Sequence, residues 1–224
     1  KLKNVEKKNF NFFNMNEKDL IKGKKILNEL GIPENSWYVT LHVREGIGNA
    51  LFNSNPLTYL KAIKEITKRG GYVFRVGDKS MTKLPKINGL IDYPFTKYKS
   101  EFFDIFLAAT CKFCIGTSSG FWSVPTFFNK PVVLVNYLPI FDYYSLSEKS
   151  FFLPKSLKYK KDNKEVSLAD IFSFPHGYLN TDLQFELNEV LYTDNTEDEI
   201  RDTVIEILNI FENNNKDGVN EKKN

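Results

Sequence analysis

The sequence contains little cysteine and no long apolar run. Among its 224 residues there is no stretch of eighteen consecutive apolar residues, so no transmembrane helix is expected, and the polar first residues lack the pattern of a signal peptide. The two cysteines are too few for a disulfide framework. We therefore expect a cytoplasmic location.

The sequence also has little excess charge. It carries 31 Lys and Arg against 28 Asp and Glu, a formal net charge of +3, and its lysines gather at the two ends and within 155–164. Such clusters are typical of solvated faces and tails, and no nucleic-acid-binding motif frames them, so we expect no nucleic-acid partner. Weak contact with an anionic membrane surface remains an alternative, although no basic amphipathic helix is evident.

Several common site motifs are missing. No GxxxxGK occurs, Gly46-Ile47-Gly48 lacks the third glycine of a dinucleotide fingerprint, and no Asp-x-Asp pair is present to hold a metal-bound diphosphate. We therefore expect neither a metal nor another cofactor. The CxxC at Cys111 and Cys114 spans a helix end and the next strand, which favours two small core residues over a redox or zinc site. His176 lies in a predicted loop, where a structural or exposed role is favoured and a catalytic one stays open.

Strand and helix patterns alternate along most of the chain. Asn16 with Asp19, and Thr196 with Glu199, have the spacing of helix N-terminal caps, and Asn55-Pro56 predicts another helix start. Such alternation predicts a Rossmann-like, mainly parallel sheet with helices on both faces. The expected strands are 37–43, 72–76, 90–91, 113–115 and 131–136, and the expected helices are 17–30, 56–69, 101–110, 120–129 and 197–212.

These elements predict a single domain. Residues 1–15 are expected to form a linker or arm, and residues 16–212 the Rossmann-like domain. Within that domain, 137–195 has an irregular, aromatic-rich pattern that indicates an insert. Residues 213–224 are expected to form a polar tail.

Polar residues follow three of the predicted strands. In an open α/β sheet, ligands bind beyond the carboxyl ends of the strands, so these residues should meet in one crevice. Arginine offers a fork of donors suited to phosphate, and hydroxyls, glycines and free amides at a helix start add to such a site. The three groups are His42 and Arg44; Arg75, Gly77 and Asp78; and Gly116, Thr117, Ser118, Ser119 and Gly120.

Each group alone also admits a structural interpretation. The first pair could form surface salt bridges, Arg75 could pair with Asp78 or Asp92, and Ser118 or Ser119 could merely cap a helix. The convergence of all three groups on one sheet edge favours a phosphate-bearing ligand.

An ordered set of segments carries a family resemblance. WYVTLHVRE, NPLTYLKAIKEITKRGGYVFRVGD, LIDYPFT, FFDIFLAATCKFCIGTSSGFWSVPTFFNKPVVLVNY and DNTEDEI together resemble a family of bacterial glycosyltransferases associated with surface-polysaccharide genes. The match covers about Leu27 to Tyr137 and Asn195 to Ile200, roughly half of the chain. It implies the GT-B architecture, in which two Rossmann-like domains face each other and the C-terminal one mainly holds a nucleotide-sugar donor.

The resemblance also implies site roles. The His-x-Arg at His42 and Arg44 is similar to the motif of GDP-fucose-dependent fucosyltransferases, in which the arginine meets the donor diphosphate. By the same resemblance, Gly116–Gly120 would cradle the diphosphate and Arg75, Gly77 and Asp78 would line the cleft. Phe52 departs from the family pattern, which often has an arginine there, and the loop 46–53 is short.

The sequence thus predicts the donor-binding half of a metal-independent glycosyltransferase. Its partners would be a nucleotide-sugar donor and a glycan acceptor, with the acceptor-binding domain upstream or in another chain. Because that domain often supplies the general base, no catalytic base is assigned. Two alternatives stay open: a nucleotide-sugar epimerase or hydrolase on the same fold, and a non-catalytic sugar-nucleotide-binding or scaffold module.

Overall fold

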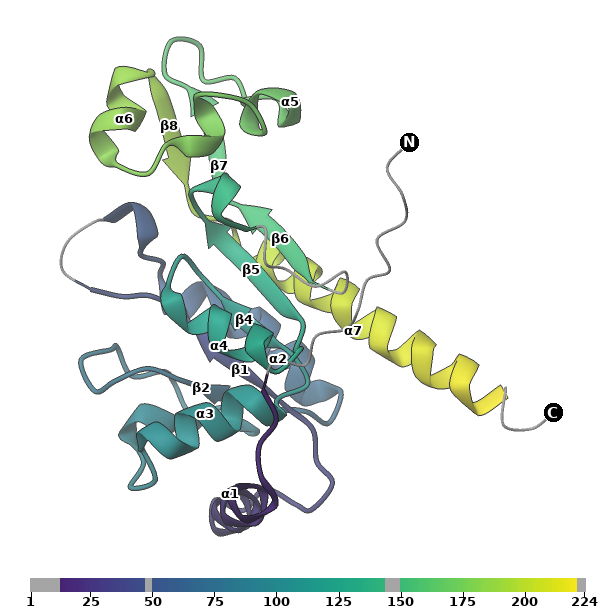
Figure 1. Ribbon diagram of the computed structural model, residues 1–224. Coiled ribbons are helices and arrows are strands. Elements are labelled where there is room, and N and C mark those ends of the chain that lie inside the picture. The colour runs from purple at the N-terminus through teal and green to yellow at the C-terminus, as the bar shows by residue number, and fades with distance from the viewer. Residues whose placement is uncertain (1–12, 47–49, 144–149, 221–224) are drawn as a thin grey trace.

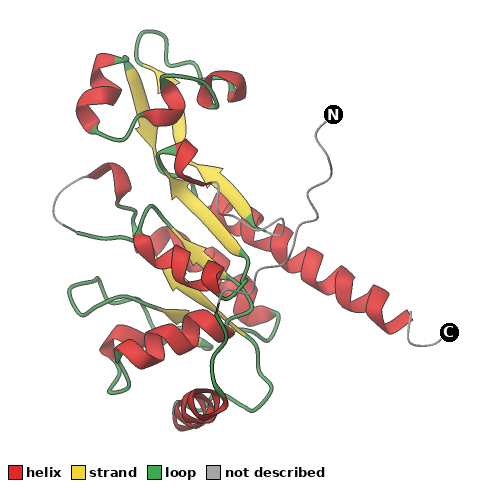
Figure 2. Ribbon diagram, in the orientation of Figure 1, coloured by secondary structure: helices red, strands yellow, loops and turns green. Residues whose placement is uncertain are grey.

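A single parallel sheet forms the centre of the molecule. The computed structural model describes residues 13–46, 50–143 and 150–220. Within them, six strands pair in the order β3-β2-β1-β4-β5-β6, and every pair is parallel. This confirms the Rossmann-like fold (Figures 1 and 2). The strands are β1 Tyr38–His42, β2 Tyr72–Arg75, β3 Leu90–Asp92, β4 Cys114–Gly116, β5 Val132–Tyr137 and β6 Phe151–Pro154.

Helices cover both faces of this sheet. On one face, α2 (Leu60–Lys68) and α7 (Glu197–Asn220) pack against each other and against strand residues such as Val39 and Leu41. On the other, α3 (Glu101–Thr110) covers residues such as Tyr38 and Phe74, and α1 (Glu17–Glu29) packs outside α3. Strand alternation therefore buries odd and even residues of β1 in two separate cores.

The predicted helix caps are confirmed. Asn16 Oδ1 accepts the Asp19 amide at 2.9 Å, directly before α1. Ahead of α7, the Thr196 amide donates to Glu199 Oε2 at 2.7 Å and the Glu199 amide donates back to Thr196 Oγ1 at 3.3 Å. Asn55 caps the chain at Pro56 as predicted, but a 3₁₀ turn, Pro56–Tyr59, precedes α2.

The segment 137–195 has far more regular structure than its irregular pattern predicts. β6 is the sixth strand of the main sheet. Beyond it, β7 (Ser156–Tyr159) and β8 (Val190–Thr193) form an antiparallel pair with α5 (Leu168–Ile171) and α6 (Asp182–Leu187). We call residues 138–143 and 155–193 the small lobe, which lies at the top of Figure 1. Its own apolar core includes Leu157, Ile171, Phe185 and Val190, and Leu51 inserts into it from the main domain.

Two boundaries differ from expectation, and a third lies mostly outside the described residues. The polar tail predicted from residue 213 is helical as far as Asn220, because α7 continues through it. The linker or arm predicted at 1–15 lies mostly outside the described residues, although Phe13 packs edge-on against Phe127 at 5.8 Å. The helix predicted at 120–129 is broken into a 3₁₀ turn, Gly120–Trp122, and α4, Ser123–Phe127.

One lysine of the cluster at 155–164 is not solvated. Lys155 is 2% exposed, and its ammonium donates to the carbonyl of Asn53 at 2.9 Å and to Asp194 Oδ1 at 2.6 Å. A buried ammonium is stable only when its donors are paired, and these two partners supply that pairing. Lys155 therefore ties the loop after β1 to the chain between β8 and α7.

Candidate functional site

The first and third predicted groups meet at the switch point of the sheet. β1 and β4 are neighbours, whereas the chain runs from β1 to β2 and β3 on the other side, so the strand order reverses between β1 and β4. His42 at the end of β1 is in register with Gly116 at the end of β4. Ligands of open α/β sheets bind in the crevice beyond such a reversal. The position of these two strand ends thus marks the candidate site.

Arg44 and the loop after β4 hold each other in place. The Arg44 amide donates to Thr117 Oγ1 at 3.0 Å, and its guanidinium lies 3.5 Å from the carbonyl oxygen of Ser118 and 5.3 Å from the ring centre of Phe52. Among the described residues, no carboxylate forms an ion pair with Arg44. Within the described part of the chain, no carboxylate neutralises this positive charge.

A cleft of about 410 Å³ opens beside this guanidinium. Its walls are polar on the loop after β4 and aromatic elsewhere, and no described carboxylate lines it. The loop contributes hydroxyl groups, while the chain after β5 contributes an apolar side. The lining residues are Arg44, Phe52, Ser118, Ser119, Gly120, Trp122, Ser123, Tyr137, Leu138 and Pro139.

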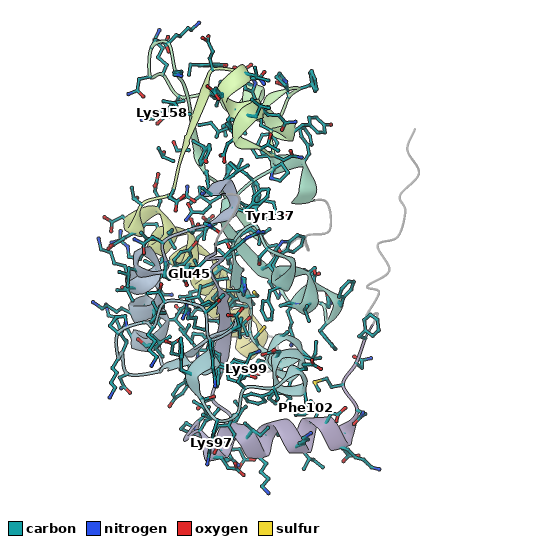
Figure 3. All side chains as sticks on the ribbon, turned by 90° about the vertical axis from the view of Figure 1, so that its left-hand side faces the viewer. Glu45, Lys97, Lys99, Phe102, Tyr137 and Lys158 are labelled. Atoms are coloured by element: carbon teal, nitrogen blue, oxygen red, sulfur yellow. The ribbon has the colours of Figure 1, made fainter. Side chains whose placement is uncertain are left out.

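The cleft lies between the main sheet and the small lobe. Figure 3 shows Tyr137 between the small lobe, which carries Lys158, and the level of Glu45 in the main domain. Ser118 Oγ accepts the amide of Leu138 at 2.9 Å, which joins the loop after β4 to the start of the small lobe. Two walls of the cleft are thus fixed relative to each other by a buried hydrogen bond.

His42 contacts the same loop through its ring. Its Nδ1 lies 2.9 Å from Ser119 Oγ, and its ring stacks on Phe121 with 5.4 Å between centroids. Burial, and after it the positive charge of Arg75, lower the pKa of His42 to about 4, against the opposing effect of Asp78. The imidazole is therefore neutral near pH 7 and can donate only one ring hydrogen.

The second predicted group lies outside the cleft lining. Arg75 is fully buried, and its guanidinium pairs with Glu45 and, at 3.1 Å, with Asp92. The ion pair with Asp92 is the structural alternative that the sequence left open. Asp78 is exposed and accepts hydrogen bonds from the amide and hydroxyl of Ser80. Gly77 has φ 146°, and a Cβ there would lie 2.1 Å from the sulfur of Met81.

The two glycines of the loop after β4 have different surroundings. Gly116 is buried, and a Cβ on it would lie 3.1 Å from Cβ of Trp122, so this glycine allows the following turn to pack closely on β4. Gly120 is exposed and has open space beside it. Because α4 has only five residues, its dipole contributes little to anion binding, and among the described residues that line the cleft Arg44 is the one with a positive charge.

Sequence reasoning missed several residues of the site. Phe52, Trp122 and Tyr137 line the cleft, but aromatic side chains do not mark a site in a sequence of which 15% is aromatic. Behind the cleft, Asn136 and Asn195 exchange amide hydrogen bonds, and Asn136 Nδ2 donates to the hydroxyl of Tyr59 at 3.2 Å. The positive φ of Asn136, 54°, cannot be seen in a strand pattern.

The remaining candidates lie away from the cleft. Cys111 and Cys114 are both buried, and burial raises the pKa of the Cys111 thiol to about 11 and that of Cys114 further, as expected of core residues.

Within the described residues, no group of three or more His, Cys, Asp or Glu side chains could hold a metal ion. None of the helices in the described ranges has the length and apolar character that a membrane crossing needs.

Comparisons with known proteins find similarity at the level of structure. No protein-family model and no curated sequence matches the chain. The crystal structure of a glycosyl transferase family 9 protein from Veillonella parvula superimposes with a TM-score of 0.53 at 11% identity, over 88% of this chain and 53% of that one. The chain shares the fold of part of this glycosyltransferase. At such low identity the similarity shows the fold alone.

Two further structures are more distant. The ADP-heptose lipopolysaccharide heptosyltransferase II of Escherichia coli gives a TM-score of 0.41 at 14% identity, over 55% of this chain and 38% of that one. The glycosyltransferase TibC of enterotoxigenic E. coli, described as iron-containing and dodecameric, gives 0.48 at 18% identity, over 80% and 47%. The chain thus spans about half or less of the length of each of these proteins.

Proposed function

We propose that this chain is the donor-binding part of a glycosyltransferase that transfers a sugar from a nucleotide sugar to an acceptor hydroxyl. The observation that carries the proposal is the guanidinium of Arg44. It lies without a described carboxylate partner beside the loop 117–120, in a cleft at the switch point of the sheet. A diphosphate supplies the anion that this site lacks, and the aromatic wall suits the rings of a nucleoside or sugar.

The proposed chemistry is electrostatic. As the bond between sugar and diphosphate breaks, negative charge develops on the departing nucleoside diphosphate. Arg44, whose backbone amide is held by the Thr117 hydroxyl and whose guanidinium lies beside the carbonyl of Ser118, would stabilise that charge. The hydroxyls of the loop would add hydrogen bonds to the phosphate oxygens. The acceptor and its general base would come from a second domain, upstream or in another chain.

The proposal also covers the pathway, the location and the metal requirement of the reaction. We place the reaction in surface-glycan synthesis in the cytoplasm and propose that it proceeds without a metal. The lack of a described metal-ligating cluster is compatible with that, and dialysis against EDTA followed by the transfer assay tests it. A loss of activity that added divalent metal restores would overturn metal independence and leave the donor assignment intact.

The test is direct titration of nucleoside diphosphates. ADP, GDP, UDP and CDP are each titrated into the wild-type chain and into Arg44→Ala, with calorimetric detection. Removing a preorganised charge donor should weaken the tightest complex by about 100-fold or more. Unchanged affinity for every nucleotide would refute the assignment of Arg44.

Product analysis by NMR with the full-length protein separates the alternative functions. Free epimerised or hydrolysed sugar would argue against transfer. A lack of turnover would indicate a binding module.

A further inference from the structure

The hydrogen bond between His42 and Ser119 is a contact that the proposed roles do not yet explain. His42 lies at the end of β1, whereas Ser119 lines the cleft, and 2.9 Å separates Nδ1 from Oγ. His42 itself is absent from the cleft lining. The route that the structure offers from the imidazole to a ligand in the cleft therefore passes through the serine.

Ser119 has one donor left to offer a ligand. Its amide is already engaged, because it donates to the carbonyl of Thr117 at 2.7 Å. The hydroxyl is the remaining polar hydrogen of this residue. The two preceding hydroxyls are positioned as acceptors, Thr117 Oγ1 by the Arg44 amide and Ser118 Oγ by the Leu138 amide, and neither hydroxyl is hydrogen-bonded to His42.

Only one hydrogen can lie between Oγ and Nδ1. If the serine donated its proton to the imidazole, the hydroxyl lone pairs would face the anion, which is electrostatically unfavourable. If Nδ1–H donates to Oγ, the serine proton is free to point at the anion, and the chain Nδ1–H···Oγ–H···O has each group donating to the next. The stack of His42 on Phe121 holds the ring in the orientation this requires.

We propose that His42 is a positioning residue that acts through Ser119: its Nδ1–H holds the serine hydroxyl so that the serine, not the histidine, donates to the phosphate of the bound ligand. This inference rests on the proposed function, because it needs an anion in the cleft. It assigns His42 the neutral tautomer with hydrogen on Nδ1. The charged groups that act on this ring are Arg44, Arg75 and Asp78.

A double-mutant cycle tests the relay. The tightest binder among ADP, GDP, UDP and CDP is titrated into wild type, His42→Phe, Ser119→Ala and the double variant. We expect Ser119→Ala to lower affinity about tenfold and His42→Phe about three- to tenfold, as for hydrogen bonds to a charged group and to a neutral one. In the Ser119→Ala background, His42→Phe should have no further effect. As a matched control, His42→Phe should keep its full cost in a Ser123→Ala background.

Two further measurements separate positioning from a purely structural role. His42→Asn places an amide N–H near the position of Nδ1, so it should restore affinity to within about threefold of wild type when Ser119 is present and have no effect when it is absent. With only two histidines in the chain, ¹⁵N-histidine labelling resolves the tautomer, and the complex should show hydrogen on Nδ1. Thermal melts of every variant verify that the protein is folded.

The outcomes are distinguishable. Equal cost of His42→Phe with and without Ser119, or the opposite tautomer in the complex, overturns the relay and indicates a direct histidine–phosphate contact or a structural role. No binding of any of the four nucleotides by the wild type overturns the proposed function, and the relay with it. Binding that survives Arg44→Ala overturns only the role of Arg44.

Discussion

Replacing Arg75 by methionine tests whether this arginine serves the fold or a ligand. The side chain is 0% exposed and neutralises Glu45 and Asp92, whose side chains are 16% and 20% exposed. Methionine fills a similar volume but leaves both carboxylates without their cation. Removing one partner of a buried ion pair typically costs about 3–5 kcal/mol of unfolding free energy.

The surroundings of the two carboxylates set the expected value within that range. Both retain some water, and each keeps a backbone donor, since the Thr82 amide donates to Glu45 at 3.2 Å and the Leu84 amide to Asp92 at 3.0 Å. These contacts compensate part of the lost charge, so we expect about 3 kcal/mol. For a chain of this size that corresponds to a fall in melting temperature of about 6–12 °C.

Urea unfolding followed by circular dichroism measures this loss. Arg75→Lys should fall between wild type and Arg75→Met, because one ammonium cannot reach both carboxylates with the geometry of a guanidinium. Nucleotide affinity of the folded Arg75→Met protein should change less than about threefold. An unfolding free energy within about 1 kcal/mol of wild type, together with a large loss of affinity, would refute the structural role and favour Arg75 as a ligand-binding residue.

Three other outcomes follow from the structure. The pKa of His42 falls from 6.5 to about 4 on folding, mainly through burial, so the folded state resists protonation. The contribution of the neutral His42 to the free energy of unfolding should therefore be fully present above pH 6.5 and decrease by up to about 3 kcal/mol as the pH falls to 4. In urea titrations at pH 7 and 4.5, His42→Phe should remove this part of the pH dependence. Gly23→Ala should destabilise the protein by about 1–3 kcal/mol in thermal melts, because the new Cβ would lie 2.1 Å from the Phe106 ring. This loss should exceed the gain from the higher helix propensity of alanine. A stabilised variant would show that α1 does not pack as described. Cys111 and Cys114 should stay unlabelled by a thiol reagent in the native protein and react once it is denatured, and rapid native labelling would contradict their burial.

Much of the sheet could be predicted because its signals are local. Short runs of β-branched, aromatic and other apolar residues identified β1, β2, β3, β4 and β5, and the side-chain oxygens of Asn16 and Thr196 marked helix starts within a few residues of where the helices begin. Both kinds of signal depend on neighbours in the sequence. The polar groups that follow β1 and β4 could be placed side by side for the same reason, since a parallel sheet brings its carboxyl ends to one edge, whereas Arg75, Gly77 and Asp78 lie outside the cleft lining.

Pairing over long distances could not be predicted in the same way. Arg75 was expected to choose between nearby carboxylates, but Glu45, 30 residues earlier, is one of its partners. Lys155 looked like a member of a solvated cluster, yet its partners are Asn53 and Asp194, more than 35 residues away on either side. Such contacts depend on the packing of whole elements, which composition and periodicity do not encode.

The dependence on long-range pairing also explains why the regular structure of the small lobe was not predicted. β7 and β8 have four residues each, too few for a clear alternation, and they pair across 30 residues that include two short helices. β6 is an apolar run of only four residues that ends in proline, and each of its positions is only partly buried, as at the edge of a sheet. Short elements at an edge give weak patterns, and the sequence consequently indicated an irregular insert.

The way the small lobe is joined to the sheet bears on how this protein can be divided. A segment that enters and leaves a domain through two linkers can be exchanged between relatives as a cassette. Here the same stretch also supplies β6, receives Leu51 into its core and shares the buried ammonium of Lys155 with both Asn53 and Asp194. Deleting or transplanting 137–195 would remove the edge of the sheet and open the loop that carries Arg44. Chimaeras that aim to change the ligand should therefore be cut within exposed turns of the lobe, such as 160–164, rather than at its junctions.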